Sequence, residues 1–373
     1  MKQTQAFLST YTADVSGVCS ALFELGGMTV MHDASGCNST YHTHDEPRWY
    51  DMDSLVYISG LSELEAVMGD DEKLIADVVD AARQLHPRFI ALAGTPIPMI
   101  TGCDLPAIAR EVEGRTNIPS FAVPSNGIGT YVAGAGQALR LYAERFITSR
   151  PEKRKNAVNI LGATPLDFSV NGCVQSMARR LEEAGFTLQS VFAMSSSIDA
   201  IDKAGAAEAN LVISSVGLPA AKYLQAQFGT PYVIGAPFGD FFSPYVFDAL
   251  RESIRTGAPA DVLGTFAPDA PDTIILGESV TAKSLAAALA VGYGIRARVI
   301  CPVEAPGGVL GACDLQLEDE EEIEEALRGA RRVIADPLYR RIVPAKSEFY
   351  PLPHEAFSGR IYRKQIPNLA ERV

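Results

Sequence analysis

A unit made of a buried strand, a turn containing glycine or proline, and an amphipathic helix recurs along this chain. It constrains the fold more than any other feature. The unit is clearest at RFIALAGTPIP, where the apolar strand 89–93 runs into a Gly-Thr-Pro turn. The other elements expected in the first 150 residues are helices over 63–85, 104–112 and 131–146 and a strand within 118–126. Such alternation predicts a parallel sheet with helices on both faces. Residues 1–50 show no long periodic run, and we expect them to be irregular.

The same unit restarts twice, after the polar stretch SRPEKRKN at 149–156 and after the Pro/Asp-rich stretch 265–272. The elements expected there are strands within 157–165, 187–194, 210–217, 230–239, 273–279, 296–304 and 331–344, and helices over 171–184, 219–228 and 282–292. We therefore predict an α/β fold of three Rossmann-like modules with parallel sheets. The predicted domains are 1–150, 151–266 and 267–373, the last with an irregular C-terminal tail.

Composition excludes some classes of function. The formal charge of −13 argues against a nucleic-acid-binding protein, which needs a basic surface. No window holds the roughly 18 uninterrupted apolar residues of a membrane span. The N-terminal MKQTQAFLST lacks the basic and apolar regions of a signal peptide, so the cytoplasm is the expected compartment. The acidic run 318–325 is interpreted as the solvated face of a helix rather than as a docking site.

The six cysteines include no Cys-x-x-Cys pair, which excludes zinc-ribbon and ferredoxin-type motifs. Cys19 and Cys37 bracket the stretch GVCSALFELGGMTVMHDASGC, and Gly17 and Gly36 lie close to them. In glycine-containing turns, backbone amides can approach thiolate ligands and lower the cost of their charge. This pair is therefore the strongest candidate for holding a metal cluster. The alternative is two buried structural thiols, since free cysteine packs as a small apolar residue.

Histidines supply the other candidates. His42 and His44 would lie on one face of a strand, as in some mononuclear metal sites, with proton delivery or a polar surface loop as alternatives. His354, in the rigid loop PLPHEAFSG, either reaches into an interdomain cleft or is a satisfied structural residue. The glycine-rich stretch 127–136 favours close helix packing over a phosphate cradle. The sequence contains no nucleotide-binding glycine motif and no serine-hydrolase elbow.

The order of these motifs resembles the component 1 family of nitrogenase-type oxidoreductases. That family includes the molybdenum–iron protein subunits, their cofactor-assembly scaffolds, dark-operative protochlorophyllide and chlorin reductases, and a nickel-tetrapyrrole reductive cyclase. The stretch 17–37 resembles the family's first two cluster-cysteine motifs, and SELEAVMGDDEKL resembles its acidic-then-Phe-Gly-Gly segment. FAVPSNG resembles its Pro-Ser turn near the cluster, and NILGATPLDFSVNGCVQSMARRLEEAGF resembles the start of its second Rossmann module. The resemblance spans nearly the whole chain, as a shortened member.

Two positions depart from the family pattern. In ALAGTPIPMITGCDL the position of the third cluster cysteine is taken by Pro96, and Cys103 lies seven residues further on. In ANLVISSVGLPAAKYLQAQFGTPYVIGAPFG the position of the cysteine that binds the iron–molybdenum cofactor is taken by Ser214. The resemblance therefore argues against a cofactor held in the nitrogenase way and against dinitrogen reduction.

By this resemblance, Cys19 and Cys37 are cluster ligands and Ser125 lies near the cluster. Two cysteines cannot complete a four-thiolate cubane. The simplest arrangement is one [4Fe-4S] cluster shared across the interface of a homodimer, or of a heterodimer with a related chain. A further ligand from Cys103 or from an oxygen donor is the alternative.

The function implied is a nitrogenase-like oxidoreductase. A separate ATP-dependent iron–sulfur reductase would supply low-potential electrons, which pass through the cluster to a small molecule in the interdomain cleft, a tetrapyrrole by analogy. Ser214, Phe238, Asp240 and His354 are expected to line the cleft, with His354 and Asp240 as catalytic candidates for proton supply. One alternative is a non-catalytic scaffold or carrier of a metallocluster or tetrapyrrole. Another is a mononuclear metal enzyme that uses His42 and His44.

Overall fold

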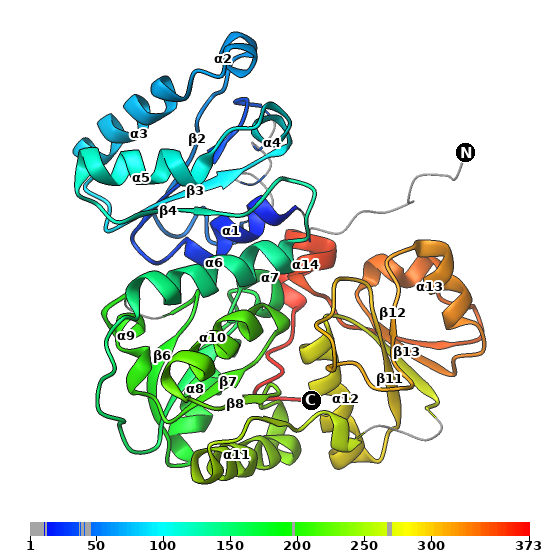
Figure 1. Ribbon diagram of the computed structural model, residues 1–373. Helices are drawn as coiled ribbons and strands as arrows, with labels where there is room; N and C mark the ends of the chain where they lie inside the picture. The colour runs from blue at the N-terminus through cyan, green and yellow to red at the C-terminus, as the bar shows by residue number, and fades with distance from the viewer. Residues whose placement is uncertain are drawn as a thin grey trace. The chain divides into compact units, whose positions relative to one another are not determined.

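The structure, a computed structural model, describes residues 11, 13–36, 38, 41, 46–195, 198–266 and 271–373 (Figure 1). Its internal contacts divide the chain into two compact units. The small unit covers Thr12–Tyr142. The large unit contains, among the described residues, Tyr11 and Ala143–Val373.

The small unit is built on a parallel sheet with the strand order β2-β1-β3-β4 (Figure 1). Its strands are β1 (Met28–His32), β2 (Leu55–Ile58), β3 (Ile90–Gly94) and β4 (Ser120–Val123). Its helices are α1 (Asp14–Leu22), α2 (Glu63–Met68), α3 (Asp71–Leu85), α4 (Pro96–Thr101), α5 (Leu105–Thr116) and the part of α6 (Tyr131–Phe146) up to Tyr142. Every residue of β1 and β3 is buried, as in parallel strands covered on both faces. Leu74 and Val78 of α3 and Ile108 of α5 join the core on one of these faces.

The expectation that residues 1–50 are irregular is wrong for the described part, which contains α1 and β1. The sequence does not indicate α1, because Ser16, Gly17 and Ser20 have weak intrinsic helix propensity. Packing against α6 stabilises the helix instead: a Cβ on Gly17 would lie only 2.2 Å from the carbonyl oxygen of Tyr131. Tertiary contact therefore overrides local propensity in this segment.

The single helix expected over 63–85 is in fact two helices, α2 and α3. Gly69 ends α2 with a φ of 68° and donates its N–H to the carbonyl of Glu65. The Asp70 carboxylate then accepts a hydrogen bond from the Lys73 N–H and caps α3. Glycine suits the left-handed conformation and aspartate is a favoured N-cap, so both residues favour a break at this point.

The large unit contains two parallel sheets. The first has the order β6-β5-β7-β8-β9. Its strands are β5 (Ala157–Leu161), β6 (Thr187–Val191), β7 (Ala209–Val212), β8 (Tyr232–Ile234) and β9 (Ala260–Asp261). The helices in this part of the chain are α7 (Pro165–Phe168), α8 (Cys173–Glu183), α9 (Ile198–Asp202), α10 (Leu218–Phe228) and α11 (Gly239–Thr256). The sequence patterns did not predict α11, which contains Pro244, a residue that usually ends a helix.

The second sheet of the large unit has the order β12-β11-β10-β13-β14 (Figure 1). Its strands are β10 (Thr273–Leu276), β11 (Ala297–Cys301), β12 (Leu315–Gln316), β13 (Arg332–Ala335) and β14 (Glu348–Pro351). The helices are α12 (Ser279–Tyr293), α13 (Glu320–Leu327) and α14 (Glu355–Ser358). Short 3-10 turns are η2 (Ala204–Ala206), η3 (Ser215–Gly217), η4 (Gly264–Phe266), η5 (Pro337–Arg341) and η6 (Gly359–Gln365). In the acidic helix α13, Ile323 and Leu327 are buried while most of the glutamates face solvent.

The predicted fold class is confirmed: the chain is α/β, with three parallel sheets. The domain boundaries near residues 150 and 266 stay a prediction, since the contacts group the second and third sheets in one unit. None of the helices formed by the described residues is both long enough and apolar enough to span a membrane. In a parallel α/β sheet, ligands bind beyond the carboxyl ends of the strands, so those ends are where the candidate residues are sought.

Candidate functional site

Cys19 lies inside helix α1 and is completely buried. The expectation that it sits in a glycine-containing turn is therefore wrong. Its neighbour Gly17 faces the backbone of α6, and a Cβ on Gly134 of α6 would lie 2.0 Å from the carbonyl oxygen of Asp14. These glycines permit a close crossing of two helices rather than an approach of backbone amides to sulfur. The same contact agrees with close helix packing as the role of the glycine-rich stretch 127–136.

The surroundings of Cys19 hold its thiol protonated. Burial, and to a lesser degree the negative charge of Glu46, raise the pKa of Cys19 far above its usual range. Burial and the same carboxylate also raise the pKa of Tyr41 well above its ordinary value. Glu46 is therefore the charged group that contributes, after burial, to the raised pKa of this cysteine.

A buried ion pair compensates the Glu46 charge. The guanidinium of Arg48 donates from Nε to Glu46 Oε1 at 2.6 Å and from Nη1 to Glu24 at 2.8 Å. It also donates to the Ser20 carbonyl at 2.7 Å and lies over the Phe23 ring, 4.6 Å from its centroid. A buried carboxylate is tolerated only when it is paired and hydrogen-bonded in this way. This cluster was not predictable from the sequence, because Glu24, Glu46 and Arg48 form no recognisable motif.

The second predicted ligand, Cys37, lies outside the described residues, as do His42 and His44. Within the described parts of the chain, no group of three or more His, Cys, Asp or Glu side chains is placed to hold a metal ion. Cys19 fits an iron–sulfur cluster by donor type, since thiolates are the ligands such clusters take. Its raised pKa means that binding would have to displace the thiol proton, which a bound metal ion does.

Ser125 and Cys103 line one groove in the small unit, with a volume of about 780 Å³. The groove lies at the carboxyl ends of β3 and β4. The Ser125 hydroxyl accepts from the Gly94 N–H at 2.9 Å and donates to the Gly94 carbonyl at 3.0 Å, so it ties the two strand ends together. The Cys103 thiol donates to the Asp71 carboxylate at 3.6 Å, and burial followed by that charge raises its pKa to about 12. Pro96, which replaces the third family cysteine, begins α4.

Ser214 follows β7 in the large unit and is completely buried. Its hydroxyl donates to the carbonyl of Gly162 at 2.8 Å. A Cβ on Gly162 would lie 2.7 Å from that hydroxyl oxygen, and Gly162 has a φ of 92°. The hydrogen bond from Ser214 thus holds the carboxyl ends of β5 and β7 close together. The hydroxyl of Ser214 therefore has a structural role.

Asp240 and Phe238 lie at the start of α11, but in different environments. The Asp240 side chain is 81% exposed and pairs with Arg180 at 2.7 Å. Phe238 is buried and lines a cavity of about 50 Å³, together with His354. Of the residues expected to line the cleft, Phe238 and His354 are brought together here, while Ser214 and Asp240 do not line this cavity.

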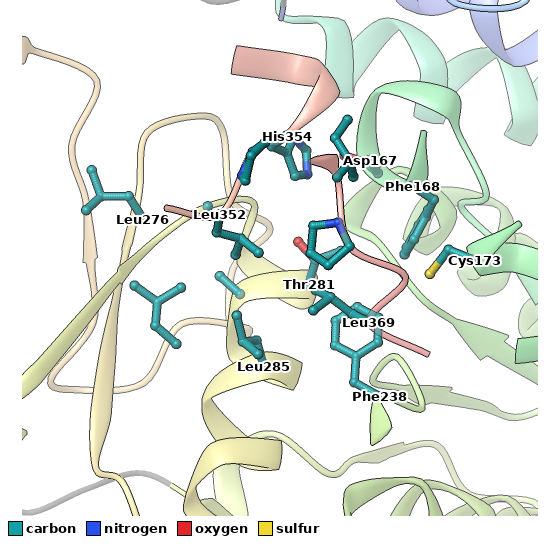
Figure 2. Close-up of a pocket in the computed structure, with 16 residues that line it drawn as sticks. Asp167, Phe168, Cys173, Phe238, Leu276, Thr281, Leu285, Leu352, His354 and Leu369 are labelled. Atoms are coloured by element: carbon teal, nitrogen blue, oxygen red, sulfur yellow. The ribbon is translucent and has the colours of Figure 1, made fainter. Parts of the chain in front are cut away.

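The cavity lies between the two sheets of the large unit, next to the carboxyl end of β10. Figure 2 shows His354 and Asp167 next to each other at one end of it, with Phe238, Leu285 and Leu369 farther along. Most of the lining is apolar, and the polar side chains in it include Asp167, His354 and Thr281. Such a mixture, few polar groups in an apolar wall, is typical of a small-molecule site.

Asp167 is the candidate that the sequence analysis missed. Its carboxylate accepts hydrogen bonds from the Tyr11 hydroxyl and from the Thr164 hydroxyl, the latter at 2.8 Å. Burial, and then the nearby charge of Glu278, raise the pKa of Asp167 from 3.8 to about 7, against the opposing effect of these hydrogen bonds. The one available signal was the position of Asp167, six residues after the buried strand β5. A perturbed carboxyl in a cavity is a functional-site candidate.

Three comparisons with known proteins bear on this site. The model of the family described as nitrogenase component 1 type oxidoreductase matches residues 16–263. The chain therefore belongs to this family of oxidoreductases, as its resemblance indicated.

Among curated proteins, the chain is similar to the nitrogenase iron–molybdenum cofactor biosynthesis protein NifE of Methanosarcina barkeri, with 28% identity over 196 residues. It is also similar to a light-independent protochlorophyllide reductase subunit of Nostoc punctiforme, with 27% identity over 181 residues. These matches cover 49% and 46% of this chain, but only 42% and 36% of the relatives. The chain thus spans less than half the length of these two relatives.

Among solved structures, the chain is similar to one titled "Nitrogenase Cp1 at pH 6.5". The TM-score is 0.69 at 16% identity, over 99% of this chain and 92% of that one. At this identity the likeness establishes the fold alone.

Proposed function

We propose that this protein is a nitrogenase-like oxidoreductase component that receives low-potential electrons and delivers them to a small molecule, with Cys19 and Cys37 as ligands of a [4Fe-4S] cluster. The observation that carries the proposal is the family match, which begins at residue 16 and so includes both cysteines. Dinitrogen is not the proposed substrate, because Ser214 stands where the cofactor cysteine is expected.

The chain's own residues support a site for such a cluster around α1. Cys19 is held at a fixed place by the α1–α6 crossing and is shielded from water. Arg48 balances the charge of Glu46 next to it, so that the acidic group does not stand alone beside a thiolate. When bound, an iron–sulfur cluster supplies one-electron transfer at low potential. Because one chain offers two ligands of this kind, we propose that two chains, identical or related, share one cluster.

The electron donor and the substrate follow from the family by analogy. A separate ATP-dependent iron–sulfur reductase is the proposed donor, and a tetrapyrrole is the proposed substrate class, since one relative is named a protochlorophyllide reductase subunit. The cavity of about 50 Å³ admits only a small group, so a tetrapyrrole would present one substituent to it. Asp167, with a pKa near neutrality, suits proton supply better than the exposed Asp240.

The test is anaerobic purification followed by iron and sulfide analysis and by electron paramagnetic resonance of the reduced protein. We expect about four irons per pair of chains and a signal that is lost in Cys19→Ala. Cys301→Ala is the matched control, because Cys301 is also a completely buried thiol but lies in the third sheet. A colourless protein that holds only zinc would contradict the proposal and would favour a mononuclear site at His42 and His44.

A non-catalytic scaffold or carrier is the second candidate, favoured by the similarity to a cofactor biosynthesis protein. Both candidates predict iron and the loss of iron in Cys19→Ala. They differ in what happens when substrate is added. In an enzyme the reduced cluster is reoxidised by the substrate, while in a carrier the cluster stays reduced. Stopped-flow absorbance with protochlorophyllide as the probe separates the two.

A further inference from the structure

His354 lines the cavity of the large unit, and one of its two ring nitrogens is a hydrogen-bond donor. Its side chain caps α14, because Nδ1 accepts a hydrogen bond from the Ala356 N–H at 3.2 Å. A nitrogen that accepts carries no hydrogen, so the neutral imidazole holds its proton on Nε2. Nε2 is buried, and no group among the residues that the structure describes meets hydrogen-bond geometry with it, although the Asp167 carbonyl lies close enough to raise the pKa of the ring slightly. A buried donor without a partner is costly, and a bound ligand is one way to satisfy it.

The His354 donor is uncharged. Burial lowers its pKa to about 4, against a smaller opposing effect of the Asp167 carbonyl, so the ring is neutral at physiological pH. Metal binding is also disfavoured in this arrangement. The lone pair of Nδ1 is already used by the Ala356 N–H, and Nε2 carries a hydrogen instead of a free lone pair.

The charges near the cavity are mostly negative. Asp167 lies in the wall, and the Glu278 carboxylate is close enough to raise its pKa. Asp336 accepts from the backbone N–H of His354 at 2.8 Å. Glu355, the residue after His354, is paired with Arg363 at 2.6 Å. An anion entering this space would be repelled by these carboxylates, and a cation would meet the N–H donor of His354 instead of a lone pair, so an uncharged ligand is the class that fits.

The remaining wall determines what such a ligand must carry. Its apolar side chains include Phe168, Phe238, Ile275, Leu285, Leu352 and Leu369. An apolar body would contact these side chains, while one polar atom would face His354 and Asp167 at the end shown in Figure 2. The volume of about 50 Å³ limits the ligand to a small molecule or to the end of a larger one.

We propose that this cavity binds an uncharged, carbonyl-bearing group of small size, whose oxygen accepts a hydrogen bond from His354 Nε2–H. A role of the cavity in orienting a substrate rests on the proposed oxidoreductase function. Binding of the carbonyl group in the cavity depends only on residues of the large unit. His354 is a positioning residue for the carbonyl, and Asp167 is the adjacent group able to hold or release a proton.

The test uses acetamide and acetate, which have the same shape but differ in charge. Protein with ¹⁵N-labelled histidine is titrated at pH 7.5, and the ring nitrogens are followed by long-range ¹H–¹⁵N correlation. We expect the Nε2–H tautomer for His354, a saturable shift of its Nε2 signal with millimolar acetamide, and binding of acetate weaker on the order of tenfold or more. His86, which is exposed, provides the control signal in the same spectra.

Three results would overturn the inference: a proton on Nδ1 of His354, equal or tighter binding of acetate, or no response to acetamide. The variant His354→Phe should lose the acetamide response as measured by calorimetry, while His86→Gln should keep it. If His354→Phe does not fold, the wild-type tautomer and the acetamide–acetate comparison still decide the question. Iron analysis of the same sample tests the cluster separately, so either proposal can fail without the other.

Discussion

Asp167 illustrates at the scale of one residue how burial makes stability depend on pH. Its pKa is raised from 3.8 to about 7 in the fold. Below pH 4 the carboxyl is protonated in both the folded and the unfolded chain, and it costs nothing. Between pH 4 and pH 7 the unfolded chain ionises while the folded one does not. Folding stability therefore falls as pH rises through this window, and the loss is complete above pH 7.

Asp167→Asn should remove this pH dependence, since asparagine stays neutral in both states. Relative to wild type, the free energy of unfolding of the variant should improve between pH 5 and pH 8. Because one pKa unit is worth about 1.4 kcal/mol, the improvement should not exceed roughly 4 kcal/mol. Urea unfolding at the two pH values measures it. Other buried acids such as Asp336 contribute equally to both proteins, so parallel pH profiles would show that Asp167 is not the responsible group.

The ion pair beside Cys19 gives a second prediction at the residue scale. Arg48→Met leaves Glu46 buried without its cation, which should cost about 3–5 kcal/mol of folding stability. Adding Glu46→Gln should restore part of the loss, because the uncompensated charge is then gone. Chemical denaturation of the two variants measures both effects. Arg115→Met, at the exposed pair with Glu72, is the control and should change little. A double variant as unstable as Arg48→Met would contradict the charge-based explanation.

The candidate site was only partly predictable from single residues. Cys19 was proposed as a ligand because its motif is local in sequence. Asp167 and Arg48 were missed because their roles depend on partners far along the chain: Tyr11 lies 156 residues from Asp167, and Glu24 lies 24 residues from Arg48. Ser125 was correctly located at the end of a strand, whereas Ser214 was expected within the strand 210–217 and follows β7 instead; both hydroxyls bind backbone groups. Sequence resemblance indicates a position, but it does not indicate how a side chain's hydrogen bonds are used.

At the scale of elements, the crossing of α1 and α6 depends on glycine. Gly134→Ala should destabilise the chain by about 1–3 kcal/mol or more, because the new Cβ would lie 2.0 Å from the Asp14 carbonyl oxygen. Gly114→Ala is the matched control: this helical glycine in α5 has open space around it and should gain up to about 1 kcal/mol. Thermal unfolding of the two variants gives the comparison. Equal effects would mean that α1 and α6 can move apart at little cost.

Elements with strong periodicity were predictable, and those formed by packing were not. The helix expected over 131–146 matches α6, and the strand expected from residue 157 begins where β5 does. In contrast, α1 has weak helix formers and α11 contains a proline, so their sequences do not indicate that these segments are helical. β1, the central strand between β2 and β3, is only five residues long and follows two glycines. Of these elements, α1 and β1 lie in the segment around Cys19, so the local sequence pattern did not predict that this cysteine lies in a helix.

At the scale of the whole molecule, a cluster shared by two chains would couple iron to subunit association. A ligand that binds only the assembled state stabilises that state by mass action, and its removal lowers the affinity of the two chains for each other. Protein purified without oxygen should therefore elute at twice the mass of one chain, and chelation of iron should shift it to the single chain. Size-exclusion chromatography with light scattering measures this. Cys19→Ala should already be shifted, whereas Cys301→Ala should not. If association survives both chelation and Cys19→Ala, the contact between the chains does not depend on a shared cluster. Each chain would then complete any cluster with its own ligands. Among the described residues of the small unit, Cys103 is the remaining thiol that could serve.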